Sequence, residues 1–178
     1  GKSNENDIFN VLVFCVRDIE KVKVPFFIEK IGPFAFNKCC KLKEFSVDQD
    51  SKLQIIDKNG FSHSSIEKIS IPHHITQIND FAFYTCKRLR KVIFPLNSEL
   101  LKLGKETFSY SSIESIQIPF TINEIERNCF DFCDKLQIIE FTECPKLKFI
   151  NKNMFMGCVK TVVMIPFKLS KRLNLTTF

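Results

Sequence analysis

Apolar residues recur along this chain at a fixed interval of 47 residues. In the clearest copy, IEKISIPHHITQINDFAFYTCKRL at 66–89, apolar residues spaced L-x-x-L-x-L precede a proline, an isoleucine pair, a phenylalanine and a cysteine. The same order returns one interval away in each direction, at Ile19, Val22, Val24, Pro25, Ile28, Ile31, Phe36, Cys39 and Leu42, and at Ile113, Ile116, Ile118, Pro119, Ile122, Ile125, Phe130, Cys133 and Leu136. Self-similarity at a fixed period indicates a repeat architecture.

Each interval contains two repeats, because a sister copy such as residues 89–112 lies between the proline-bearing copies. Repeat starts therefore alternate 23 and 24 residues apart, at Ile19, Leu42, Ile66, Leu89, Ile113, Leu136 and Lys160. One phenylalanine marks each unit, at Phe14, Phe36, Phe61, Phe83, Phe108, Phe130 and Phe155. This regular spacing predicts a solenoid of about seven repeats.

Each repeat is expected to open with a β-strand. The pattern predicts parallel strands at about 19–24, 42–47, 66–71, 89–94, 113–118, 136–141 and 160–165, stacked into one sheet at roughly 4.8 Å per step. The proline after several of these strands removes a ladder donor where the chain turns away. The apolar pair that follows suits either a short 3₁₀ or helical turn or irregular extended structure, and its spacing does not decide between them.

The repeats cover nearly all of the 178 residues, so we expect one leucine-rich-repeat domain over 1–178. Residues 1–13 are assigned to an N-terminal tail and partial cap, 14–166 to repeats and 167–178 to an incomplete terminal repeat. Lys160 stands where isoleucine or leucine opens the other strands. The start GKSN has no apolar signal segment, and the last residues end within a repeat, so the chain is expected to be an excised fragment.

Composition narrows the class of protein. An apolar content of 44% with 20 phenylalanines supports a continuous core, and only five glycines argue against a phosphate-cradling nucleotide fold. The sequence contains no run of 18 apolar residues, which is the length that would predict a membrane span. The net charge of +6 is spread along the chain, and the phenylalanines recur at core positions. Neither feature favours nucleic-acid binding, which needs clustered positive charge and stacking aromatic residues.

The eight cysteines are interpreted mainly as free thiols. Cys39, Cys86 and Cys133 occupy one repeat position, and the sister units place Ser64, Ser111 and Cys158 there. A position that accepts cysteine or serine requires a small side chain, and buried cysteine is a common small hydrophobe. The one disulfide worth testing is Cys133–Cys158, because these residues lie in neighbouring repeats.

The candidate residues for catalytic or metal chemistry are His73 and His74, which could pair with Cys86 in a cysteine–histidine or metal site. The equivalent positions in other repeats are Phe26-Phe27 and Phe120-Thr121, so imidazole is not required there. No sequence motif of a hydrolase, zinc protease or nucleotide-binding loop is present. We therefore predict no enzyme and no catalytic, metal or cofactor residues.

The proline-bearing pattern I-x-I-P-x-x-I-x-x-I-x-x-x-A-F-x-x-C-x-x-L resembles the BspA-like leucine-rich repeat. The segments that carry the resemblance are VPFFIEKIGPFAFNKC, IPHHITQINDFAFYTC and IPFTINEIERNCFDFC, with SKLQIIDKNGFSHSSI and SELLKLGKETFSYSSI between them. Alternation of the two units is similar to versions from mucosal protist parasites. Cys129, where Ala35 and Ala82 stand in other copies, and Lys160 depart from the pattern towards the C-terminus. The resemblance implies a right-handed leucine-rich-repeat coil with a parallel sheet on its concave face.

The same resemblance implies a function, since members of this family are largely surface-exposed or secreted proteins implicated in adhesion. It implies a non-enzymatic binding module from an adhesin-like surface protein, in contact with a protein, the matrix or a host surface. The alternative is an intracellular scaffold or host-directed effector in the cytoplasm, and the free thiols favour it. The sequon at Asn174 mildly favours secretion. No nucleic-acid partner and no membrane insertion are expected.

The binding face is predicted from strand alternation. The third and fifth residues of each L-x-x-L-x-L strand point away from the core. The N-terminal half of this face is charged and polar, and the C-terminal half becomes apolar without a core reason, which usually marks a contact. The predicted partner-binding residues are Lys21, Lys23, Lys68, Lys91, Ile93, Ile138, Glu140, Val162 and Met164. The alternative for the apolar residues is that further repeats, the C-terminal tail or a second copy of the chain covers them.

Overall fold

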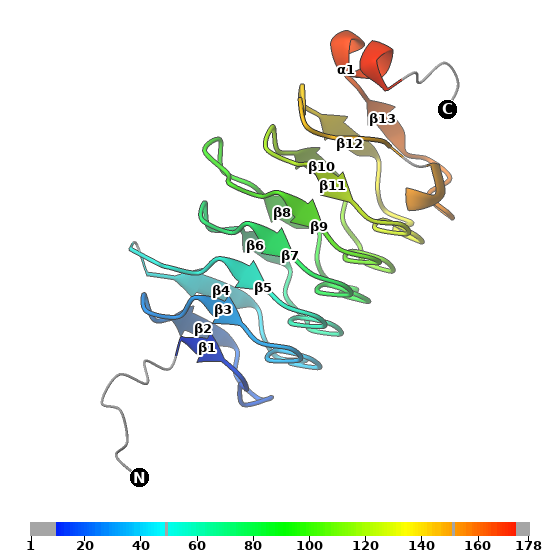
Figure 1. Cartoon of the computed structure of the whole chain (residues 1–178). Helices are drawn as coiled ribbons and strands as arrows, with labels where there is room; N and C mark the ends of the chain where they lie inside the picture. The colour runs from blue at the N-terminus through cyan, green and yellow to red at the C-terminus, as the bar shows by residue number, and fades with distance from the viewer. Residues whose placement is uncertain (1–9, 49, 151, 174–178) are drawn as a thin grey trace.

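The computed structural model describes residues 10–48, 50–150 and 152–173. The chain winds as a parallel β-solenoid of about seven turns, in which each turn lies against the next along one axis (Figure 1). Short and long strands alternate along the sequence from β1 (Val11–Leu12) to β12 (Ile138–Phe141), and each kind builds its own parallel sheets. The predicted fold class is therefore confirmed.

The longer strands form where the L-x-x-L-x-L segments predict them, and all pair in parallel. They are shorter than predicted, because ladder pairing begins two residues after each repeat start. The strands are β2 (Lys21–Val24), β4 (Glu44–Val47), β6 (Lys68–Ser70), β8 (Lys91–Ile93), β10 (Ser115–Ile118), β12 (Ile138–Phe141) and β13 (Val162–Met164). Register follows the repeat, with Ser115, Ile138 and Val162 side by side on successive turns.

A second parallel sheet runs through the apolar pairs that follow the turns. The spacing of these pairs is compatible with a helical turn or with extended structure, and in the structure most of them end in a two-residue strand. The strands are β1 (Val11–Leu12), β3 (Lys30–Ile31), β5 (Ile55–Ile56), β7 (Gln77–Ile78), β9 (Lys102–Leu103) and β11 (Glu124–Ile125). The second residue of each strand lines up with its neighbours, so Ile31, Ile56 and Ile78 form one buried column.

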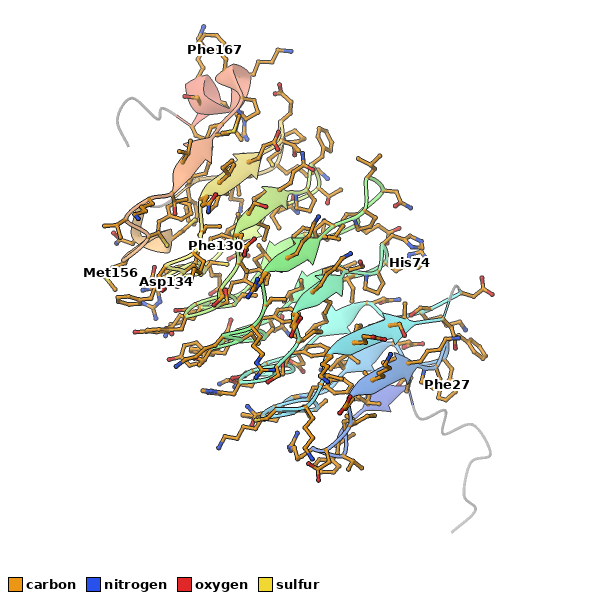
Figure 2. The ribbon with its side chains drawn as sticks, turned by 180° about the vertical axis from the view of Figure 1, so that it is seen from behind. Phe27, His74, Phe130, Asp134, Met156 and Phe167 are labelled. Atoms are coloured by element: carbon orange, nitrogen blue, oxygen red, sulfur yellow. The ribbon has the colours of Figure 1, made fainter. Side chains whose placement is uncertain are left out.

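A stack of phenylalanine rings fills the core along the solenoid axis. Phe36, Phe61, Phe83, Phe108 and Phe130 are fully buried. Their rings lie nearly parallel, with successive centroids 4.8, 5.2, 5.4 and 5.7 Å apart. Phe155 extends the stack at 5.9 Å from Phe130. Figure 2 labels Phe130, one member of this stack.

Each stacked phenylalanine lies in an arc with two residues in the left-handed backbone region. The paired residues, four positions apart with φ between 51 and 61°, are Phe34 and Lys38, Asn59 and His63, Phe81 and Thr85, Glu106 and Tyr110, and Asn128 and Phe132. This conformation costs roughly 1–2 kcal/mol for each residue with a side chain. Amides in the arc donate to carbonyls of the next turn, as from Phe61 to Ala82 and from His63 to Tyr84. These hydrogen bonds hold the arcs together turn by turn.

The long-strand sheet is interrupted between β4 and β6. No ladder joins these two strands, although the short-strand sheet continues past them from β3 to β7. Phe45 lies on β4 where the other turns carry valine or isoleucine, and its ring meets Phe36 and Phe61 edge-on. The interruption therefore coincides with the largest side chain in this column.

The two ends of the described chain depart from the regular turns. Phe14 was expected as the terminal aromatic residue of a partial first repeat, but it is 63% exposed, with the Arg17 guanidinium 4.9 Å from its ring centroid. At the other end a short 3₁₀ helix η1 (Lys152–Met154) precedes β13, and residues 167–172 form helix α1 (Phe167–Arg172). Leu169 of α1 is buried, and Arg172 donates to the carbonyls of Cys144 and Leu147, so α1 packs against the last turns. The Asn174 sequon lies outside the described residues.

Candidate functional site

The outward side of the long-strand sheet, called here the strand face, carries the predicted site residues. It consists of the first and third residues of β2, β4, β6, β8, β10, β12 and β13. All of these residues are exposed except Ile93, which is half-buried. The prediction of which side chains point away from the core is therefore correct, and whether they bind a partner stays a proposal.

Ion pairs occupy the N-terminal end of the strand face. Lys21 Nζ lies 2.9 Å from Glu44 Oε1, and Lys23 Nζ lies 2.6 Å from Asp48 Oδ1. The Lys23 ammonium lowers the pKa of the Asp48 carboxyl, and the Glu44 carboxylate raises the pKa of Lys21. Lys68 and Lys91 are adjacent in register, and neither has an acidic partner within 4 Å among the described residues. The predicted lysine stripe is thus neutralised at one end and free at the other.

A shallow hollow of about 380 Å³ lies at the middle of the strand face. Ser115 on β10 stands between Lys91 on β8 and Ile138 on β12 in the ladder register. Because its side chain is small, it leaves a depression between these two longer neighbours. Ile93 and Glu140 also line the hollow, so four predicted site residues meet there. This cavity is called the Ser115 hollow below.

An apolar strip continues from the Ser115 hollow towards the C-terminal end. Ile138 pairs with Val162, and Glu140 pairs with Met164, across β12 and β13. Ile138, Val162 and Met164 are 42, 58 and 50% exposed. Their neighbours in the strands, such as Ile139, point inward and are buried, which leaves the strip without any packing role in the core.

All eight cysteines are free thiols, and Cys133 and Cys158 are not bridged. Cys86, Cys133 and Cys158 donate through sulfur to the carbonyl of the phenylalanine in the preceding turn, at 3.1, 3.1 and 3.0 Å. Ser64 and Ser111 lie beside Cys86 and Cys133, which places cysteine and serine in one column, as predicted. Burial raises the pKa of the Cys86 and Cys133 thiols to about 12. Such thiols are not poised as nucleophiles.

His73 and His74 lie at the edge of the solenoid where the long strands end, and Figure 2 shows His74 on the same side as Phe27. Nδ1 of His74 lies 3.3 Å from Glu99 Oε2. The two imidazole centroids are 3.8 Å apart, while Cys86 is buried beside Ser64. The structure thus does not bring these residues together as a cysteine–histidine pair. Among the described residues no group of three or more His, Cys, Asp or Glu side chains could hold a metal ion.

The repeat geometry agrees with a comparison against family models. Two overlapping segments, residues 8–137 and 54–175, match the BspA type leucine rich repeat region, with six copies. The chain belongs to the BspA-type leucine-rich repeat family. No curated protein sequence matches the chain.

Solved structures with the same kind of repeat have low sequence identity to this BspA-type chain. The crystal structure of the pneumococcal vaccine antigen PcpA is 18% identical over 84% of the chain and 51% of that protein, with a TM-score of 0.50. A leucine rich cell surface protein from Faecalibacterium prausnitzii is 18% identical over 84% of the chain and 54% of its own length, with a TM-score of 0.48. The chain thus spans about half the length of these proteins. At this identity the likeness shows the fold alone.

Sequence reasoning missed two features of the strand face. The acidic partners of Lys21 and Lys23 could have been found, because Glu44 lies one repeat after Lys21 and parallel register places them side by side. The role of Ser115 as the floor of a hollow depends on its two longer neighbours, so its residue type alone gives no signal.

Within the described residues, no helix has both the length and the hydropathy to span a bilayer.

Proposed function

We propose that this BspA-type chain is a non-enzymatic binding module of a cell-surface or secreted protein, and that its strand face contacts a partner protein. The observation that carries the proposal is the exposed strip of Ile138, Val162 and Met164 beside the Ser115 hollow. An apolar centre with a polar surround is the usual anatomy of a protein contact. Glu140, Lys91 and Gln117 supply that polar surround.

The finer role that we propose is adhesion, with a host-surface or matrix protein as the partner. Support comes from the family membership, because BspA-type repeat proteins are usually surface proteins that mediate protein interaction. The competing function is an intracellular scaffold or effector that uses the same face. The eight free thiols support this alternative, because disulfides are common in extracellular domains.

The cellular location of the protein distinguishes surface adhesion from an intracellular scaffold or effector function. An antibody raised against the purified chain should label intact cells that express the full-length protein, or the protein should be recovered from their medium. Labelling that appears only after the cells are permeabilised, with no protein in the medium, would reject the surface function and leave the intracellular one.

The same strip could join two copies of the chain instead of a foreign partner. The Ile138→Ser/Val162→Ser/Met164→Ser triple variant tests this by sedimentation or light scattering. If the wild type is monomeric at micromolar concentration, self-association through the strip is excluded. If it is dimeric and the triple variant is monomeric, the strip is an interface between copies and the proposal of a foreign partner there is wrong.

A further inference from the structure

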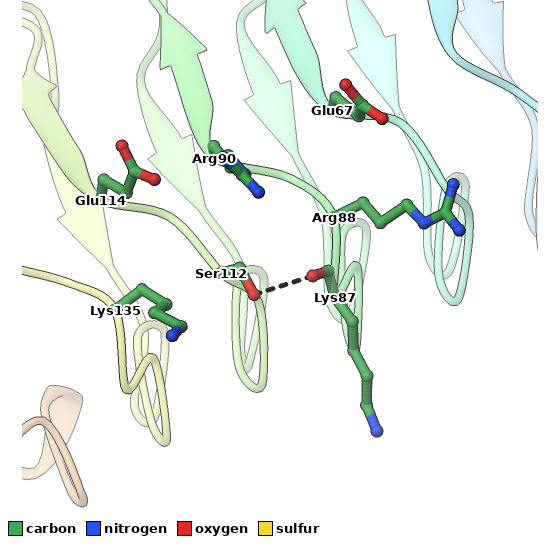
Figure 3. A pocket seen from close by; sticks show the side chains of 7 residues that line it. All are labelled: Glu67, Lys87, Arg88, Arg90, Ser112, Glu114 and Lys135. Atoms are coloured by element: carbon green, nitrogen blue, oxygen red, sulfur yellow. Dashed lines mark hydrogen bonds between the residues drawn. The ribbon is translucent and has the colours of Figure 1, made fainter.

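A second hollow, separate from the strand face, lies at the edge where the chain leaves each arc and enters a long strand. It has a volume of about 590 Å³ and is lined by charged and hydroxyl side chains. Figure 3 shows Lys87, Arg88 and Arg90 from one turn around it, with Ser112 from the next turn and Lys135 from the turn after that. We call it the basic hollow.

The positive charge of the basic hollow is not neutralised within the fold. Lys87, Arg88, Arg90 and Lys135 are exposed, and none has a carboxylate within 4 Å among the described residues. Glu67 and Glu114 flank Arg90 on the neighbouring turns, because the Arg90 amide donates to the Glu67 carbonyl and the Glu114 amide donates to that of Arg90. The four cations that line the hollow, Lys87, Arg88, Arg90 and Lys135, outnumber its two acidic residues, Glu67 and Glu114.

The basic hollow continues into a neighbouring depression along the solenoid axis. This second depression, of about 400 Å³, shares Lys87 and Arg88 with it and adds Lys38, His63, Ser65 and Thr85. Through these two shared residues the depressions follow one another from the turn before β4 to the turn before β12, a span of roughly 19 Å at about 4.8 Å per strand step. The two depressions together are called the trough. A trough of this length suits a linear chain better than a single ion.

The lining indicates the chemistry of that chain. Ammonium and guanidinium groups pair with sulfate or carboxylate, and the hydroxyls of Ser65, Thr85 and Ser112 can hydrogen-bond to a polyhydroxylated ligand. A peptide is recognised with pockets for its side chains, whereas the lining here offers no large apolar residue. Bases of single-stranded nucleic acid stack on open aromatic faces, and among the described residues no phenylalanine, tyrosine or tryptophan lines either depression.

From this combination we infer that the trough binds a linear anionic polysaccharide, with Lys87, Arg88 and Lys135 holding its sulfate or carboxylate groups. The site lies beyond the proposed protein contact, because it opens where the strands begin and not on the strand face. The two sites can therefore be tested separately.

The test compares two triple variants that remove the same charge. Lys87→Gln/Arg88→Gln/Lys135→Gln should weaken the binding of a size-defined heparin oligosaccharide by about tenfold or more, since it removes three charge-assisted contacts. The control, Lys146→Gln/Lys148→Gln/Lys168→Gln, removes three exposed lysines that lie past the carboxyl ends of the strands, and its dissociation constant should stay within about threefold of the wild type. Titration calorimetry at near-physiological salt measures both, with circular dichroism to confirm folding.

Each result decides the inference. If the wild type binds the oligosaccharide and still binds it after desulfation, the carboxylate groups are sufficient for recognition. If the wild type no longer binds after desulfation, sulfate is the recognised group. No binding by the wild type would overturn the inference. An equal loss in both triple variants, or tighter binding of polyglutamate or a single-stranded oligonucleotide of matched charge, would also overturn it.

Discussion

At the scale of single residues, Gly104 is fixed by a close backbone approach. A Cβ atom at this position would lie 2.5 Å from the backbone nitrogen of Asp80 and 2.6 Å from its Oδ1. The same Oδ1 accepts a hydrogen bond from the Lys105 amide, so it cannot move away without losing that contact. The missing side chain of Gly104 thus allows its backbone to lie against that of Asp80 in the preceding turn.

Gly104→Ala should lower the free energy of unfolding by about 1–3 kcal/mol, because overpacking forces the backbone apart. Ser70→Ala, at an exposed position of β6, is the control and should change stability by less than about 0.5 kcal/mol. Urea denaturation followed by circular dichroism measures both. Equal stability of the two variants would contradict the packing at Gly104.

The buried thiols make a second prediction at this scale. Burial raises the pKa of Cys86 from 9.0 to about 12, so the folded protein keeps this thiol neutral when the unfolded chain would ionise it. Its contribution to stability is complete below pH 9 and is lost as the pH rises towards 12.

Because only the thiolate reacts, a maleimide or disulfide reagent at neutral pH should label exposed Cys40 rapidly and leave Cys86 and Cys133 protected until unfolding.

Mass spectrometry of the labelled peptides checks this order. Cys86 labelling as fast as Cys40 in the folded protein would show that the cysteine column is not closed to solvent. The shared position of cysteine and serine was predictable from sequence, because Ser64 and Ser111 alternate with the thiols at one register. The hydrogen bonds from sulfur to the phenylalanine carbonyls were not predictable, since they depend on the distance between the thiol and the carbonyl of the preceding turn.

At the scale of elements, the phenylalanine stack is the feature that joins one turn to the next. Phe83 lies between Phe61 and Phe108, with centroid distances of 5.2 and 5.4 Å, so its removal breaks contacts on both sides. Phe83→Ala should therefore cost about 3–5 kcal/mol. Phe120→Ala removes an equal side chain that is 58% exposed and should cost less than about 0.5 kcal/mol. Comparable unfolding midpoints for the two variants in urea would refute a stabilising stack.

The long strands and the stack were predictable because each depends on a residue type that recurs at one register. The short-strand sheet was not, since two-residue strands have too few positions to show an alternating pattern. The left-handed pairs also escaped prediction, because residues as different as Phe34, Glu106 and Asn128 adopt them. Hydrogen bonds to the next turn, not side-chain identity, fix that conformation.

At the scale of the whole molecule, the solenoid keeps the two proposed binding surfaces apart. The strand face presents apolar residues at its C-terminal half, and the trough presents cations at the edge before the strands. The sequence showed the alternation that places Ile138, Val162 and Met164 outward. Arg88 and Lys135 occupy the same repeat position, 47 residues apart, so their placement along one edge was predictable. The hollow between them was not, because it depends on the side chains of three successive turns.

The central claim is that the strand face is the contact surface of this chain. The most direct measurement is the binding of the purified chain to an immobilised panel of extracellular-matrix proteins by surface plasmon resonance. The strip variant Ile138→Ser/Val162→Ser/Met164→Ser is compared with a control that changes exposed apolar residues past the strand ends, Phe26→Ser/Leu96→Ser/Phe120→Ser.

The account predicts that the wild type binds at least one protein of the panel and that the strip variant binds it about tenfold or more weakly, because central apolar contacts dominate such interfaces. The control variant should bind like the wild type. Binding by the strip variant equal to that of the wild type, or no binding of the wild type to any matrix protein, would contradict the claim.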